Sequence, residues 1–483
     1  MDSQSASPPQ PPRPLPSAVR RRARRGCLTA LLVFAILITL PFAFAAYFRA
    51  FHSPWPKPPE GVRLDPRTPL IPRSELTESD AQYHLLACTS KFHRVDGWNE
   101  DYERWVYLGR HGAPYPALAE FTRTNADWLA HIARAAHAPS NRWHFTLAFD
   151  EPLPWLSPCI SCFRQSGWQA WTAEQEAGPD AADAHLRDTL QLATHMFGSG
   201  PLIQHLVGLD GIRAACDHIA RAAVDEPAPS PARLNQWIRM LHEFEPTTDS
   251  LLETLRYEYL LLSNMTHQVY SSADMESELY SIGLATKKHS RLLRLVGSTL
   301  PRTQRHVADT YKCLLAQTEH PSRSGGFDAW FESRFAQHRR KFILDDPIGM
   351  VMLSIMMPAH ERMLERHREL VAATRAARLV CALQLHRLEH EGRWPDHLTD
   401  LVPNILSELP SDPFRSDNAT FGYRLCERDG FVLWSVYRNG HDDGGASTLN
   451  QPQDAEDLVF GPAMDRLWRE FYEAELTPAG SSD

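Results

Sequence analysis

Glycine is scarce in this chain, with 24 residues among 483, and the 37 prolines follow no repeat period. Collagen-like and low-complexity chains need such residues in a regular or dominant pattern, so both classes are excluded. Hydrophobic residues make up 43 %, which excludes disorder throughout. The length allows two or three domains.

Positive charge is scarce beyond the first residues. Residues 1–26 hold six arginines and one aspartate, a net charge of +5, whereas the whole chain carries −9, so the remainder carries −14. Because binding to a phosphate backbone needs a basic surface, this acidic body argues against nucleic acid as a partner.

Three common catalytic motifs are also absent. The chain contains no G-x-S-x-G, no Walker A sequence and no G-x-G-x-x-G. The sequence therefore has no signature of a serine hydrolase of the nucleophile-elbow type, a P-loop NTPase or a dinucleotide-binding enzyme.

One long apolar run lies near the start. Residues 28–48 contain no charged side chain, and five of the arginines stand directly before them. At about 1.5 Å per residue the run spans roughly 30 Å, the thickness of a bilayer's hydrocarbon core. Arginine-rich flanks stay cytoplasmic, so we predict a transmembrane helix over residues 27–48 with its N-terminus inside.

A cleaved signal peptide is the alternative for this run. Residues 28–40 would be its apolar region and Ala43-Phe44-Ala45 its cleavage site. The uncharged run continues past that site, which favours the uncleaved anchor. Both alternatives place residues 49–483 outside the cytoplasm, so we expect a single-pass protein of a bacterial inner membrane with a periplasmic bulk.

We predict a mainly α fold after the anchor: an extracytoplasmic α-helical bundle or array, then a small C-terminal α+β module with an antiparallel sheet. The expected segments are a disordered tail (1–26), the transmembrane helix (27–48), a proline-rich spacer (49–76), the α-helical domain (77–359), a long helix with the α+β module (360–462) and a tail (463–483).

Apolar spacing and capping residues predict the helices. Apolar residues recur at three- and four-residue intervals over 118–132, Ser230 precedes Pro231 as an N-cap, and Ser250 with Glu253 forms a capping box. Further helices are expected around 180–225, 273–297, 301–319, 327–341 and 360–391.

The last hundred residues change character. Gly392 followed by Pro395 ends the long helix. Residues 421–426 and 430–436 are strand-like and flank an Asp-Gly hairpin signal, and residues 457–460 are a third candidate strand.

Four pieces of this region stand in a fixed order: HEGRWPDHLTDLVPNILSELPSDPF, FGYRLC, GFVLWSVYRNGHDDGG and EDLVF. Residues 379–460 thereby resemble the globular module of the major pseudopilin of type II secretion systems. The whole layout resembles membrane-anchored bacterial proteins with a helical body and a pseudopilin-like tail. The resemblance implies an architecture and an envelope or secretion setting, but no reaction.

Related pseudopilins bind Ca²⁺ in the loop between the last two strands. The resemblance therefore implies a possible calcium site, since hard cations take six to eight oxygen ligands. The available groups are Asp442, Asp443, Asp454 and Asp457, with Asn439 and Ser447 as neutral oxygens. The alternative is a solvated polar loop without an ion. Tyr437 stands where the family often has glycine.

His386, Glu389 and His390 fit the H-x-x-E-H pattern. On a helix, histidines four residues apart share a face and could both bind Zn²⁺, with the glutamate as general base. No third ligand is identifiable by spacing, and the alternative is that these side chains pack or lie exposed.

Cys159 and Cys162 form a single C-x-x-C without a second pair or a βαβ setting, which argues against a four-thiolate zinc site and a thioredoxin-like role. A structural disulfide between them, or from them to Cys88 or Cys216, suits an extracytoplasmic compartment.

Two hypotheses of function follow. The first is a non-enzymatic, membrane-anchored envelope protein, a scaffold or interaction component with a link to secretion. Its partners are the lipid bilayer, through residues 27–48, and envelope or secretion proteins. The second is an extracytoplasmic, metal-dependent hydrolase with its site between helices.

Overall fold

The computed structural model describes residues 73–145, 152–197, 200–225, 227–271, 300–319, 347–415, 417–446 and 457–462, together with Met464, Arg466 and Glu470. The expected cytoplasmic tail, the transmembrane helix, nearly all of the spacer and of the C-terminal tail, and the helices expected at 273–297 and 327–341 lie outside these residues. In the part that is described, no helix combines the length and the apolar character needed to cross a bilayer.

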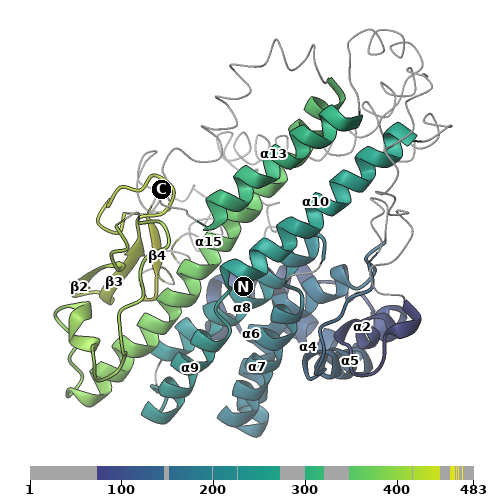
Figure 1. Ribbon diagram of the computed structural model, residues 1–483. Coiled ribbons are helices and arrows are strands. Elements are labelled where there is room, and N and C mark those ends of the chain that lie inside the picture. The colour runs from purple at the N-terminus through teal and green to yellow at the C-terminus, as the bar shows by residue number, and fades with distance from the viewer. Residues whose placement is uncertain are drawn as a thin grey trace, which may run out of the picture.

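The fold is mainly helical, with a small antiparallel sheet near the C-terminal end (Figure 1). The α-helices are α2 (Ala81–Cys88), α3 (Trp98–Leu108), α4 (Pro116–Thr124), α5 (Ala126–Ala136), α6 (Leu156–Ala177), α7 (Pro179–His195), α8 (Leu202–Val224), α9 (Pro231–Glu243), α10 (Thr248–Ser271), α13 (Leu300–Glu319) and α15 (Pro347–Glu389). Short 3-10 helices are η1 (Arg73–Glu75), η2 (Thr89–Lys91), η3 (Gly109–Gly112) and η4 (Leu398–Leu401). The strands are β2 (Gly422–Cys426), β3 (Gly430–Ser435) and β4 (Leu458–Phe460).

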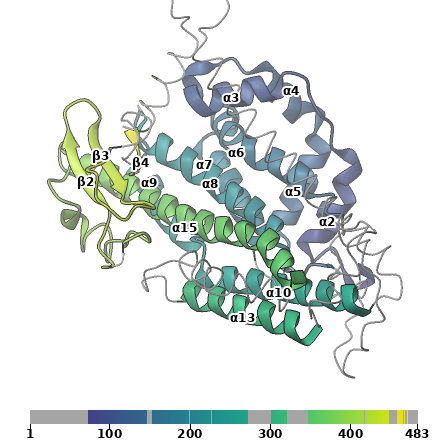
Figure 2. The same cartoon turned by 90° about the horizontal axis from the view of Figure 1, so that it is seen from above.

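Helix α15 lies in the middle of the molecule. It packs on α8 and α9 on one side and on α13 on the other, and the sheet lies beside its C-terminal half (Figure 2). Five alanines in that half, at positions 372, 373, 376, 377 and 382, are at most 3 % exposed. Their small side chains let neighbouring elements approach the helix closely from several directions.

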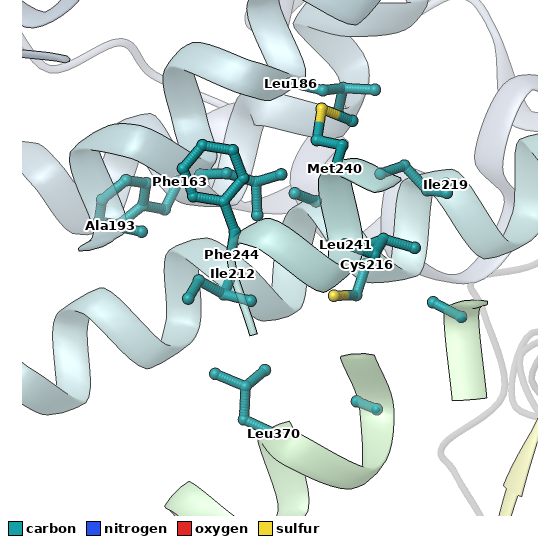
Figure 3. Close-up of a cluster of buried hydrophobic side chains, with 14 of the residues drawn as sticks. Phe163, Leu186, Ala193, Ile212, Cys216, Ile219, Met240, Leu241, Phe244 and Leu370 are labelled. Atoms are coloured by element: carbon teal, nitrogen blue, oxygen red, sulfur yellow. The ribbon is translucent and has the colours of Figure 1, made fainter. Parts of the chain in front are cut away.

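The core of the body is built from the buried side chains of five helices, α6, α7, α8, α9 and α15. Figure 3 shows the labelled side chains of this cluster: Phe163 from α6, Leu186 and Ala193 from α7, Ile212, Cys216 and Ile219 from α8, Met240, Leu241 and Phe244 from α9 and its end, and Leu370 from α15. Gly208 lets α8 approach α7, because a Cβ there would lie 2.7 Å from the carbonyl oxygen of Ala193. Burying each large apolar side chain contributes about 1.5–3 kcal/mol.

The single helix expected over 118–132 is in fact two helices, α4 and α5, which meet at Asn125. The Asn125 Oδ1 accepts a hydrogen bond from the backbone N–H of His93 at 2.7 Å, and its Nδ2 donates to the His93 carbonyl at 3.0 Å. Asn125 is buried for this contact with a distant segment. The apolar spacing continues across this break, so it does not predict where one helix ends and the next begins.

The expected start of α10 is also corrected, whereas that of α9 is confirmed. Helix α10 begins at Thr248 because the Thr247 hydroxyl, not that of Ser250, acts as its cap and accepts the Ser250 N–H at 3.3 Å. In α9 the Ser230 hydroxyl accepts the Arg233 N–H, as expected. Helix α6 is an addition to the expected helices.

The C-terminal elements follow the expected order. Strands β2 and β3 form an antiparallel hairpin, with Gly430 at φ +81°, and β4 pairs antiparallel with the other edge of β3. Helix α15 ends where Gly392 adopts φ +83° and donates its N–H to the Arg387 carbonyl. Because α15 begins at Pro347, one continuous helix crosses the boundary expected at 359/360.

Arg375 of α15 ties the helical body to the C-terminal module. Its Nε donates to the Glu245 carboxylate at 2.9 Å, beside the start of α10. One of its terminal nitrogens donates to the carbonyl and hydroxyl oxygens of Ser411, at 2.8 and 3.0 Å. Arg378 lies 3.4 Å from the same carboxylate.

We expect the substitution Arg375→Met to lower the free energy of unfolding by about 2–3 kcal/mol, because it leaves Glu245 and Ser411 half-buried with fewer donors. Urea unfolding of the full chain measures this. Arg123→Met is the control, since Arg123 is exposed and, among the described residues, pairs only with Glu120 on its own helix, and should leave the midpoint nearly unchanged. Equal losses in the two variants would contradict the assigned role of Arg375.

Candidate functional site

The acidic loop between β3 and β4 is organised by Trp434. The Trp434 Nε1 donates to the Asp442 carboxylate at 2.8 Å, and the Gly444 N–H donates to the same oxygen at 3.1 Å. The indole lies against Gly422 of the paired strand, where a Cβ would come within 2.0 Å of the ring. A glycine at 422 is therefore required for the loop to take this position.

Asp457 lies beneath this loop at the start of β4. Its Oδ2 accepts the Gly445 N–H at 2.8 Å, whereas its Oδ1 is buried and has no hydrogen-bond donor among the described residues. Burial raises the pKa of Asp457 to about 6; the Gly445 N–H lowers it, and the nearby Asp443 and Asp442 carboxylates raise it further. A buried carboxylate oxygen without a hydrogen-bond donor can bind either a proton or a cation.

The structure brings together only part of the predicted calcium site. Asn439 donates from its Nδ2 to Asp443 at 2.9 Å, and Asp442 is already bonded to Trp434. Asp454 and Ser447 lie outside the described residues. In the ranges that are described, no three histidine, cysteine or acidic side chains are placed to hold a metal ion. Asp457 Oδ1 is the one observation that fits an ion, and the calcium site stays a prediction.

Asp412 of the L-P-S-D-P-F sequence anchors the module from within. Its carboxylate accepts hydrogen bonds from the Ser435 hydroxyl at 2.8 Å and from the N–H groups of Val436 and Phe414 at 3.0 Å. It is 1 % exposed, and burial raises its pKa even though these donors lower it. Asp412 thus joins the end of β3 to the segment that follows η4.

The start of the acidic loop docks on α15 through Glu369. The Tyr437 hydroxyl and the Arg438 guanidinium both donate to its carboxylate, the latter at 2.9 Å. Tyr437 adopts φ +47°, a conformation that favours glycine. The hydrogen bond of its side chain to Glu369 holds Tyr437 in this conformation.

His386 and His390 do not point their nitrogens at a common position. Their rings are stacked, with centroids 3.8 Å apart and planes 8° from parallel, and the His390 Nδ1 bonds the His386 carbonyl at 2.9 Å. Because the lone pairs lie in the ring planes, nearly parallel rings cannot both direct them at one zinc ion. Glu389 is exposed. This arrangement gives the zinc hypothesis no support.

Cys159 and Cys162 lie on one face of α6 and are buried as free thiols. The described residues also hold Cys88 and Cys216 as free thiols. Burial raises the pKa of Cys162 to about 12 and that of Cys159 well above its ordinary value, so neither is poised as a thiolate. A disulfide from this pair stays a prediction.

A buried polar cluster lies where α8, α10, α13 and α15 meet. One Glu258 oxygen accepts the N–H of Leu202, the first residue of α8, at 2.7 Å. The other lies 3.9 Å from the His360 Nε2, which is 2.7 Å from the Tyr311 hydroxyl. Burial raises the pKa of Glu258 to about 7.

A second branch of the cluster contains two histidines. The Thr254 hydroxyl lies 2.9 Å from the His205 Nδ1, and the His205 Nε2 lies 3.4 Å from the His367 Nδ1. Burial lowers the pKa of His205 to about 3 and that of His367 to about 4, so both are neutral at pH 7. Two proton arrangements fit these distances. In the first, Thr254 donates to the Ser250 carbonyl, His205 to Thr254 and His367 to His205; in the second, Thr254 donates to His205 and His205 to His367.

The six side chains of this cluster are at most 8 % exposed, so they stabilise a junction of helices and are not open to a substrate. None of them was singled out from the sequence. The available signal was local: Thr254 and Glu258 interrupt the apolar face that Leu251, Leu255 and Leu262 form on α10. A polar pair on such a face predicts buried partners, but it does not say which.

In comparisons with known proteins, no protein-family model, no curated protein and no solved structure matches the chain.

The calcium prediction is tested at Asp457. If an ion neutralises this buried carboxylate, 1 mM Ca²⁺ should raise the melting temperature of the full chain over that in chelator, because ligands that bind the folded state stabilise it. Asp457→Asn should abolish the difference. Asp417→Asn, an exposed aspartate of the same module, should keep it. If Ca²⁺ leaves the melting temperature of the unaltered protein unchanged, the calcium prediction is wrong.

Glu258→Gln should stabilise the protein at pH 8 but not at pH 4.5. Between those values the unfolded glutamate ionises while the buried one keeps its proton, so the native protein loses stability as pH rises from about 4.5 to 7. The variant avoids this loss, a gain of up to about 3 kcal/mol. Burial of His205 and His367 has the opposite pH dependence, since it lowers the stability of both proteins as the pH falls below about 6.5. The effect is the same in the variant and in the native protein, so it cancels in their difference.

Urea unfolding across this pH range measures the difference between the two proteins. Glu253→Gln, an exposed position on the same helix, is the control and should follow the native curve. A constant difference between Glu258→Gln and the native protein would show that Glu258 does not titrate between these pH values.

Proposed function

We propose that the protein is a membrane-anchored component of the bacterial cell envelope that presents its C-terminal module to protein partners and catalyses no reaction itself. The anchor at residues 27–48 and the pseudopilin resemblance of residues 379–460 support the setting. The carrying observation is that the module exposes the outer edge of β2 and is held on the helical body by hydrogen bonds.

The attachment of the module supports a role in presentation. Arg375 bonds the body and the module at once, and Glu369 of α15 binds the loop that follows β3. Asp412 then joins that loop to the segment after η4. A module with such connections keeps its orientation relative to the body, which reduces the entropy lost when a partner binds.

The sheet has two outer strands among the described residues, β2 and β4, and β2 is the more exposed of the two, because β4 is mostly buried. Among the described strands β2 pairs with β3 alone, so its outer N–H and C=O groups face away from the sheet. Leu425 on this strand is 46 % exposed, and Arg424 is exposed beside it. Unpaired edges with accessible side chains are sites where another chain can add a strand. A protein partner in the envelope is the occupant that this edge fits.

The hydrolase hypothesis has less support. The polar cluster around Glu258 lies between helices, where such a site was expected, but its side chains are buried. The rings of His386 and His390 are stacked, which gives a zinc site no support. A purified chain that carries one zinc per molecule would favour this hypothesis over the first.

A photoreactive amino acid at position 425 should crosslink the full chain in native membranes to one or a few defined proteins. The matched control is position 260 on α10, a leucine that is 39 % exposed and far from the sheet in sequence. Adducts are identified by mass spectrometry of the membrane fraction. Recovery of the same proteins from both positions, or of none from position 425, would refute the role of the β2 edge.

A further inference from the structure

A cavity of about 480 Å³ lies between α3, α6 and α8, and its lining includes no residue of the sheet or of the Glu258 cluster. Cavities that bind small molecules in proteins have volumes of about 300–1,000 Å³. Its lining includes Tyr102 and Trp105 from α3, Arg164 and Trp171 from α6, and His218 from α8. No feature of the proposed partner-binding role uses this cavity.

Aromatic rings form the apolar part of the lining. The ring centroids of Trp105 and Trp171 are 5.9 Å apart, with planes inclined by 41°, so the two indoles form a corner. Trp105 is held from behind by Tyr115, whose ring meets it edge-on at 5.6 Å. Tyr102 adds a third ring, with the Arg164 guanidinium 5.6 Å from its centroid. Such walls favour a flat, unsaturated ligand.

The polar groups that lack partners at this cavity are nitrogens. The His218 Nε2 is buried without a partner among the described residues. Arg164 has no carboxylate within ion-pair distance in the described part of the chain; its guanidinium lies over the Tyr102 ring and acts on the Asp210 carboxylate only at longer range. Burial lowers the pKa of His218 to about 4, so its ring is neutral.

The acidic groups of the lining are already paired. Glu174 receives two hydrogen bonds from Arg233, at 2.5 and 3.2 Å, and Asp217 receives two from Arg213, at 2.8 and 2.9 Å. Asp225 and Arg221, of opposite charge, each have a partner as well. The cation left to attract a ligand is Arg164, which favours an anion over a cation or a neutral molecule.

We propose that this cavity binds a small aromatic carboxylate, with its ring against Trp105 and Trp171 and its carboxylate on Arg164. The site is separate from the β2 edge, so failure of one proposal leaves the other standing.

Isothermal titration of the full chain in detergent micelles with 2-naphthoate tests the site. We expect saturable binding, with at least about tenfold weaker binding of 2-naphthamide, which keeps the ring but lacks the charge. Acetate, which keeps the charge but lacks the ring, should also bind at least about tenfold more weakly. Equal binding of the amide would overturn the anion selectivity, and equal binding of acetate would overturn the aromatic contact.

Arg164→Met should weaken 2-naphthoate binding at least about tenfold and leave the weak binding of 2-naphthamide unchanged. Arg187→Met is the matched control, because Arg187 also stacks on an aromatic ring, that of Phe244, outside the cavity lining. A melting curve of each variant checks that it folds. Unchanged affinity in Arg164→Met, or no binding of 2-naphthoate to the native chain at millimolar concentration, would refute the site.

Discussion

Helix α15 is the constraint on which the rest of the structure depends. The body and the C-terminal module are not linked by a flexible connection, because one helix belongs to the core of both. Its alanine-rich second half allows α8, α9 and the sheet to pack around it. Hydrogen bonds from Arg375 to Ser411 and from Arg438 to Glu369 also hold the module on this helix.

The buried polar groups follow from this arrangement. At the junction of α8, α10, α13 and α15, the first backbone N–H of α8 lies inside the protein and has no partner within its own helix. Glu258 accepts a hydrogen bond from this N–H. A carboxyl buried for this purpose has a raised pKa and needs polar neighbours, which His360 supplies. The cluster resembles an active site in composition, but its place in the packing explains it as a junction between helices.

Much of the fold could be predicted from sequence, and the sites much less. Ser230 as an N-cap, the hairpin before Gly430 and the helix end at Gly392 were correct, because each depends on residues a few positions apart. The break at Asn125 was missed because its cause is a bond to His93, more than thirty residues away. Of the expected calcium ligands, the described loop brings together only some, and Asp457 is the one with an unpaired oxygen.

By itself, the sequence determined where the long helix ends and where the strands of the C-terminal region lie, since caps, turns and apolar spacing act over one or two turns of chain. Only the tertiary structure decided which polar side chains meet. Tyr311 and His360 are 49 residues apart, so no short-range pattern predicts their contact. The cavity beside Trp105 and Arg164 was likewise decided by packing, because its walls come from three helices whose relative positions no short-range pattern contains.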